Sequence, residues 1–260
     1  MIKKVIIEEN FSKHAWDYDQ HSKVQNFCAS TLIERVKGKS FSKILDIGCG
    51  TGNYTKLLRE KFSKAKIVAI DISSEMIKVA KKKLEDKEIE FIVADAQEFR
   101  LEEEFDLISS NASFQWFQDL KLDLIKYREA LSAGGTILFS TFGPETFFQL
   151  HSCLKEFLNK PVAISASNFL KRAEIERILK DIFKEVSVRE EIYNQEYDSL
   201  LELLENLRCT GTRGDGLRGE IFWTSRRIAQ IEKIYKKRFS AEGGKSIVAT
   251  YQMLFCRGNK

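Results

Sequence analysis

Three aspartates recur at almost equal spacing in the first half of the chain. Asp46, Asp71 and Asp95 each close a short apolar run rich in β-branched residues, and they lie 25 and 24 residues apart. A carboxylate accepts hydrogen bonds from ribose hydroxyls or amino groups, and its charge favours a cationic ligand. Any one of these aspartates alone suits a helix cap. The three in order at strand ends predict a nucleoside-binding site.

A glycine-rich turn follows the first of these aspartates. The segment Ile47-Gly48-Cys49-Gly50-Thr51-Gly52 leaves an apolar run and enters a helical pattern, and its glycines let the backbone approach a ligand closely. A nicotinamide dinucleotide site needs G-x-G-x-x-G, but Asn53 stands where its third glycine should be. Asp46 would also repel a pyrophosphate. The pattern therefore predicts S-adenosylmethionine, which carries an ammonium and a sulfonium group and has no phosphate.

The elements that position these residues alternate between strands and helices. This alternation predicts βαβ units with parallel strands, whose carboxyl ends meet at one edge of the sheet. We therefore expect an α/β fold of the Rossmann-like class I methyltransferase type, with a mostly parallel seven-stranded sheet, a final antiparallel strand and helical lid elements. The predicted strands lie near 44–46, 67–71, 91–95, 106–109, 136–141, 186–188 and 247–256, and the helices between the first five near 54–62, 74–84 and 122–131.

The domain organisation follows from the same patterns. Residues 1–40 are predicted to form an N-terminal helical lid segment, because a helical pattern runs from about Asn10 to Val36. Residues 41–260 are predicted to form the methyltransferase domain. A helical insertion at about 197–240 interrupts its last strand pair, and we interpret it as a lid or a substrate-binding element.

Composition excludes several classes of protein. The chain has 42 basic and 38 acidic residues, a net charge of +4, which is too balanced for a typical nucleic-acid-binding protein. No apolar run approaches the roughly 20 residues of a membrane span, and the N-terminus does not match a secretory signal. The five scattered cysteines suit neither a zinc site nor a disulfide framework. We expect a cytoplasmic protein without metal, nucleic-acid or membrane partners.

Longer motifs lie outside the glycine-rich turn. They are Phe11-Ser12-Lys13, Tyr18-Asp19-Gln20-His21 with Gln25, Ser110-Asn111-Ala112-Ser113-Phe114-Gln115-Trp116, Phe139-Ser140-Thr141-Phe142-Gly143-Pro144-Glu145-Thr146, Leu207-Arg208 with Gly211-Thr212, and Ala249-Thr250-Tyr251. Together with the glycine-rich turn, these motifs resemble the malonyl-[acyl-carrier protein] O-methyltransferases of biotin synthesis along the whole chain. Thr212 departs from the pattern of that family, where alanine is usual, and this weakens only the comparison of the lid.

The resemblance implies methylation of the free carboxylate of a malonyl group on acyl carrier protein, an early step of biotin synthesis. A carboxylate with a pKa near ~4 is already ionised at neutral pH, so it needs no general base. The three histidines belong to no obvious catalytic triad, and this agrees with a reaction that needs no general base. We expect Tyr18, Asn111, Gln115 and Trp116 to position the substrate, with Gln115 or Asn111 as the polar anchor.

Tyr18 and Gln25 lie seven residues apart, so they would share one face of a helix. We expect this face to close over the cofactor, and a helix that simply packs on the core is the alternative. The predicted cofactor-binding residues come from this helix, the glycine-rich turn and the strand ends: Gln25, Asp46, Gly48, Cys49, Gly50, Asp71, Ile72, Met76, Asp95, Ala96 and Asn111.

A predicted helix at 223–239 carries basic residues opposite an apolar stripe that includes Ile231. We expect Arg226, Lys233 and Lys237 to dock the acidic carrier protein. A solvated charged face without a partner is the alternative. Other functions also stay open: a carboxyl methyltransferase for a free small acid, a methyltransferase for a quinone precursor or RNA, and a non-catalytic nucleotide-binding module.

Overall fold

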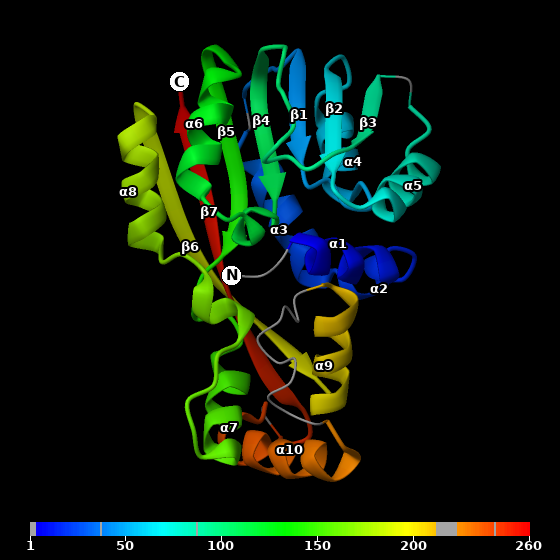
Figure 1. Cartoon of the computed structure of the whole chain (residues 1–260), viewed down its shortest axis with the longest axis vertical. Coiled ribbons are helices and arrows are strands. Elements are labelled where there is room, and N and C mark those ends of the chain that lie inside the picture. Colours follow the sequence, from blue (N-terminus) through cyan, green and yellow to red (C-terminus); the bar gives the residue numbers. More distant parts are fainter. Residues whose placement is uncertain (1–3, 37, 87, 212–222, 242) are drawn as a thin grey trace.

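Seven strands form one mixed sheet in the order β3-β2-β1-β4-β5-β7-β6 (Figure 1). The computed structural model describes residues 4–36, 38–86, 88–211, 223–241 and 243–260. Neighbouring strands are parallel except for β7, which runs antiparallel to both β5 and β6. The predicted fold class is confirmed. The strands are β1 (Lys43–Ile47), β2 (Lys66–Asp71), β3 (Ile89–Val93), β4 (Phe105–Asn111), β5 (Leu131–Phe142), β6 (Glu185–Tyr197) and β7 (Ile247–Asn259).

Helices cover both faces of the sheet. One buried apolar cluster joins the strands to α3 (Lys23–Glu34) and α4 (Asn53–Lys61), and a second joins them to α6 (Leu120–Glu129) and α8 (Arg172–Ile182). Each of these helices buries residues three or four positions apart, which is the spacing of one helix face. Helix burial therefore fixes the sheet from both sides and holds the strand ends in place.

The long strands β6 and β7 extend past the rest of the sheet into a second lobe (Figure 1). They pair without interruption from Glu185 opposite Asn259 to Tyr197 opposite Ile247. Three helices pack on this extension. They are α7 (Phe148–Leu158), α9 (Leu200–Cys209) and α10 (Ser225–Phe239). Residues 197–240 thus supply α9 and α10, whereas α7 comes from an earlier part of the chain.

The N-terminal region forms three helices, where one continuous helix was predicted. α1 (Lys4–Lys13) and the short α2 (Tyr18–His21) lie below the sheet in Figure 1, where α1 packs against α5 (Ser74–Lys83) and α9. Ser22 separates α2 from α3, since its hydroxyl bonds the backbone oxygen of Asp19 at 3.2 Å. α3 then packs on the sheet.

Two 3-10 helices complete the described elements, η1 (Phe114–Trp116) and η2 (Ser165–Asn168). None of the helices in the described part of the chain combines the length and the apolar character that crossing a membrane demands.

Candidate functional site

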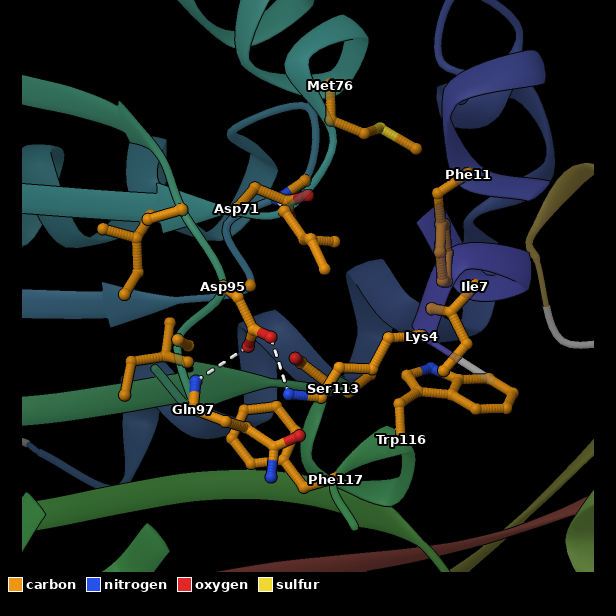
Figure 2. A pocket seen from close by; sticks show the side chains of 18 of the residues that line it. Lys4, Ile7, Phe11, Asp71, Met76, Asp95, Gln97, Ser113, Trp116 and Phe117 are labelled. Carbon is orange, nitrogen blue, oxygen red and sulfur yellow. Dashed lines mark hydrogen bonds and ion pairs between the residues drawn. The ribbon is translucent and has the colours of Figure 1, made fainter. Parts of the chain in front are cut away.

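A pocket lies between the carboxyl ends of the parallel strands and helix α1 (Figure 2). It collects most of the predicted site residues at the sheet edge where ligands of such folds bind. Its wall includes Tyr18, Gly48, Gly50, Asp71, Ile72, Met76, Asp95, Ala96, Asn111 and Trp116. Four predicted residues are not part of this wall: Gln25, Asp46, Cys49 and Gln115.

Helix α1 covers the pocket with residues that the sequence interpretation did not include. Lys4, Ile7 and Phe11 line the pocket from one side of the helix (Figure 2). They are three and four positions apart, which is the spacing of one helix face. That spacing was the available signal, but the predicted helix began only at Asn10. Ser113 and Phe117, beyond β4, also line the pocket and were not predicted.

The glycine-rich turn packs directly against the loop that follows β4. Gly48, Gly50 and Gly52 all have positive φ, at 67°, 55° and 84°. A Cβ atom at Gly48 would lie 2.2 Å from Ser113 Oγ, so only glycine fits there. Cys49 contributes its backbone to the turn, since its N–H donates to the Ile70 oxygen at 3.0 Å. This bond holds the turn against β2.

Asp71 ends β2 and connects two loops of the pocket. Its carboxylate accepts from the Gly50 N–H and from the Ser73 N–H, both at 2.9 Å. Burial raises the pKa of this carboxyl group, although the two backbone hydrogen bonds oppose that rise. Each oxygen keeps further lone pairs, so Asp71 can still accept hydrogen bonds from a ligand.

Asp95 follows β3 and faces the first helix. Its carboxylate accepts from the Gln97 N–H at 2.9 Å and from Lys4 Nζ at 2.6 Å (Figure 2). Desolvation would lower the pKa of Lys4, but the hydrogen bond and charge of Asp95 outweigh it, so the Lys4 pKa is raised. The Lys4 ammonium of α1 thus forms an ion pair with a carboxylate that we predicted to bind the cofactor.

Asp46 does not reach the pocket, contrary to the prediction. β1 continues to Ile47, so Asp46 lies inside the strand and its side chain is fully buried. Its Oδ2 accepts a 2.6 Å hydrogen bond from Thr55 Oγ1 of α4, while Oδ1 has no partner among the described residues. Burial raises its pKa to about 7, with a further contribution from the charge of Asp71. This carboxyl group therefore connects β1 to α4.

Asp19 of α2 ties the N-terminal helices to the cofactor turn. Oδ1 accepts from Thr51 Oγ1 at 2.6 Å and from Asn53 Nδ2 at 3.0 Å, and Oδ2 accepts from Lys83 Nζ at 2.5 Å. Partial burial alone would raise the Asp19 pKa, but these hydrogen bonds and the charge of Lys83 lower it overall. The neighbouring Tyr18 lines the pocket.

Gln25 is not part of the pocket wall, because the helix is interrupted at Ser22. Gln25 and Tyr18 therefore lie on different helices and do not share a helix face. Its side chain is largely buried on α3. Its backbone oxygen accepts a 3.0 Å hydrogen bond from Asn111 Nδ2. Asn111 itself lines the pocket and accepts from Ser140 Oγ at 2.8 Å. Gln25 therefore positions a pocket residue through its backbone.

Gln115 also turns away from the pocket. Its Nε2 donates to the Ala112 oxygen at 2.6 Å, and its Oε1 accepts from Thr141 Oγ1 at 3.2 Å. Both ends of the amide are satisfied within the protein, so the polar anchor predicted at this position is not available. The next residue, Trp116, lines the pocket.

The predicted carrier-docking residues lie in the second lobe. Arg226, Lys233 and Lys237 are exposed on α10, while Ile231 and Tyr235 of the same helix are fully buried. Figure 1 shows α10 at the end of this lobe that is farther from α1.

Comparison with known proteins identifies the family. The model of a family described as "Methyltransferase domain" matches residues 44–135. A malonyl-[acyl-carrier protein] O-methyltransferase of Bacillus anthracis is 36% identical over 263 residues, which cover 98% of this chain and 97% of that protein. The chain belongs to the malonyl-[acyl-carrier protein] O-methyltransferase family. The predicted family and enzyme class, an S-adenosylmethionine-dependent O-methyltransferase, are confirmed.

Two further proteins are similar to this chain, one in part of its sequence and one in its fold. The enzyme of the same name from Priestia megaterium is 45% identical over 156 residues, which span 59% of this chain and 57% of that protein. The phosphoethanolamine N-methyltransferase 2 of Haemonchus contortus, solved with S-adenosyl-L-methionine, has a TM-score of 0.60 and 18% identity. The match covers 96% of the chain described here and 57% of the solved chain. This second likeness concerns the fold alone.

Proposed function

We propose that this chain, acting in the cytoplasm, transfers the methyl group of S-adenosylmethionine to the free carboxylate of a malonyl group on acyl carrier protein. The observation that carries the proposal is the 36% identity to a relative of that name over 98% of the chain. The pocket at the strand ends supports it, because ten of the predicted site residues line one space.

The pocket fits the methyl donor by its chemistry. Gly48 and Gly50 have no side chains, so a ligand can approach the backbone beside Asp71. The oxygens of Asp71 have lone pairs that can accept from ribose hydroxyls. Met76 and Ile72 supply apolar surface for an adenine ring. Asp95 and the backbone near Ala96 would hold the adenine amino edge. When bound, S-adenosylmethionine supplies an electrophilic methyl group on a sulfonium centre.

The acceptor chemistry needs positioning rather than proton transfer. One carboxylate oxygen forms a bond to the methyl carbon as the carbon–sulfur bond breaks, its electron pair stays on sulfur, and no proton moves. Among the residues that the structure describes, the pocket wall includes no histidine. Holding the two reactants in line can supply ~7–11 kcal/mol of the barrier reduction. Tyr18, Asn111 and Trp116 are the proposed positioning residues.

The carrier protein is the proposed partner, with α10 as its docking surface. Exposed Arg226, Lys233 and Lys237 would attract an acidic protein and raise the rate of association. Because α10 lies in the second lobe, the body of the carrier would contact this lobe while its thioester arm reaches toward the pocket.

The decisive experiment incubates the purified protein with S-adenosylmethionine labelled in its methyl group. Malonyl-carrier, malonyl coenzyme A and free malonate are offered in parallel, with acetyl-carrier as the control that lacks the carboxylate. We expect base-labile label on malonyl-carrier and none on acetyl-carrier. Equal or faster labelling of free malonate would favour the small-acid methyltransferase. No label on malonyl-carrier would overturn the proposal.

A further inference from the structure

Trp116 lines the pocket, and its buried indole N–H has no hydrogen-bond partner among the described residues. Among the described residues, Trp116 Nε1 is one of seven buried side-chain polar atoms without a hydrogen-bond partner. Of those seven atoms, it alone belongs to a residue that lines the pocket. Native proteins rarely leave a buried donor unpaired, since the lost hydrogen bonds to water cost free energy. An acceptor brought by a ligand would remove that cost.

Two aromatic contacts fix the orientation of this indole. Phe11 of α1 packs on it edge-on, with ring centroids 6.4 Å apart at 76°. Phe169, which directly follows η2, also packs edge-on, at 5.7 Å and 87°. Edge-to-face pairs of this kind are preferred aromatic geometries. The N–H direction is therefore set by packing before any ligand binds.

The charges of the pocket leave an anionic acceptor without a free cation. In the described wall, Lys4 is the basic residue, and Asp95 already holds its ammonium at 2.6 Å. Desolvation and the charge of Asp71 raise the pKa of the Tyr18 hydroxyl, so it stays a neutral donor. Tyr18 and Trp116 both flank Phe11, at 6.2 Å and 6.4 Å. An incoming carboxylate would therefore meet neutral donors.

Neutral donors suit a carboxylate that must act as a nucleophile. A bidentate ion pair with arginine would engage both oxygens and stabilise the ground state strongly. A single N–H can hold one oxygen and leave the other free to attack. Rate is gained only from interactions that favour the transition state over the ground state.

We propose that Trp116 Nε1–H donates to one oxygen of the acceptor carboxylate and so orients the other toward the methyl group. The inference rests on the proposed function, because it needs a carboxylate acceptor. Lys4 and Ile7 of α1 line the same pocket as this indole (Figure 2). Nε1 is covered in this state, so the atoms that cover it must move before an acceptor oxygen can reach it.

The first test removes the N–H and keeps an aromatic ring. We expect Trp116→Phe to lower kcat/KM for malonyl-carrier on the order of 100-fold, with the dissociation constant of S-adenosylmethionine unchanged within about twofold. Trp116→His, assayed near pH 8 where its ring is a neutral N–H donor, should recover part of the loss. Trp223→Phe is the matched control, because Trp223 Nε1 is also buried without a described partner but lies outside the pocket wall.

The second test observes the hydrogen bond in the wild-type protein, and substitutions serve only to assign its resonances. The chain has three tryptophans, and their indole N–H resonances can be assigned with 15N labelling and single substitutions. With S-adenosylhomocysteine present to prevent turnover, malonyl-carrier should move the Trp116 indole proton downfield, and acetyl-carrier should not.

The outcomes separate the two proposals. If wild-type protein methylates malonyl-carrier while Trp116→Phe does so equally well, the role of Trp116 is wrong and the proposed function stands. Identical Trp116 resonances with malonyl-carrier and acetyl-carrier would lead to the same conclusion. If the wild-type protein labels no carboxylate at all, both proposals fall.

Discussion

Thr51 Oγ1 donates a 2.6 Å hydrogen bond to Asp19 Oδ1, across 32 residues of sequence. Thr51 belongs to the glycine-rich turn and Asp19 to α2, so this bond joins the cofactor loop to the helices that cover it. Lys83 Nζ of α5 bonds the second oxygen of the same carboxylate at 2.5 Å. The Asp19 side chain thereby connects α2 to the glycine-rich turn and to α5.

Replacing this carboxylate should weaken cofactor binding. We expect Asp19→Asn to raise the dissociation constant of S-adenosylmethionine about 10-fold, because hydrogen bonds to charged groups contribute ~1.5–3 kcal/mol and Asp19 is partly exposed. Isothermal titration calorimetry measures this directly. Asp17→Asn is the matched control, since Asp17 makes no side-chain cap bond at the start of α2. Equal affinities of the two variants would contradict the role of Asp19 as a connection.

Much of this site could be predicted because strand order fixes it. Asp71 ends β2 and Asp95 follows β3, and parallel pairing brings both to one edge of the sheet. Short apolar runs identified both strands, although only β2 is buried along most of its length and β3 is a partly exposed edge strand. Asp46 shows the limit of the same reasoning, because the strand runs one residue further and turns its side chain into the core.

The features that could not be predicted depend on tertiary packing. β6 was expected at 186–188 but spans Glu185–Tyr197, because an edge strand with one solvated face carries many polar residues and gives no apolar run. Lys4 reaches Asp95 over 91 residues of sequence, and no local pattern announces such a pair. The inward or outward direction of the Gln115 side chain on η1 likewise depends on Thr141, which comes from β5.

Tyr18 should affect catalysis more than folding. Its side chain lines the pocket at the end of an aromatic series through Phe11 to Trp116. We expect Tyr18→Ala to lower kcat on the order of 100-fold, the usual loss for one well-placed donor, with the circular dichroism spectrum unchanged. Tyr193→Phe, on β6 against Phe27, is the control and should retain full turnover. Unchanged turnover of Tyr18→Ala would show that Tyr18 does not position the reactants.

Gly48 should be intolerant of a side chain for two separable reasons. An alanine at φ 67° is strained by about 1–2 kcal/mol, and its Cβ would lie 2.2 Å from Ser113 Oγ. Gly38→Ala carries comparable strain at φ 75° with nothing within 4 Å, so it isolates the strain. We expect both variants to lower the melting temperature and Gly48→Ala alone to weaken cofactor binding. Normal affinity in Gly48→Ala would show that the turn adjusts to the contact.

Asp46 should make the protein less stable as pH rises from about 4 to 7. Burial raises its pKa from 3.8 to about 7, so the folded state binds a proton that the unfolded state has released. The free energy of unfolding should therefore fall across this window, by roughly 2–4 kcal/mol. Asp46→Asn should flatten the fall, as measured by urea unfolding between pH 4 and 8.

Asp106 provides a control of opposite sign for that experiment. Partial burial alone would raise its pKa, but hydrogen bonds from Ser42, Lys43 and Ser132 lower it overall. Its contribution to stability is present above the unfolded pKa and is lost as pH falls through the folded pKa. Asp106→Asn should thus lower stability at neutral pH. A wild-type profile that rises between pH 4 and 7, and is unaltered in Asp46→Asn, would contradict the assignment.

The basic face of α10 should control the encounter with the carrier and leave the chemical step unchanged. We expect reversal of charge in Arg226→Glu/Lys233→Glu to raise the apparent KM for malonyl-carrier about 10-fold, with little change in kcat. The effect should shrink as salt rises, because exposed charges are screened within about 8–10 Å near physiological ionic strength. Steady-state kinetics at two salt concentrations measure both quantities.

A matched double reversal elsewhere distinguishes docking from a change of net charge. Lys64 and Lys81 are exposed and lie outside α10, so Lys64→Glu/Lys81→Glu changes the total charge by the same amount. If both double variants raise KM equally, the carrier responds to overall charge and α10 is not its docking surface. If only the α10 variant does, and free malonyl coenzyme A is unaffected by it, the carrier contacts this helix. No change in either variant would leave α10 as a solvated face.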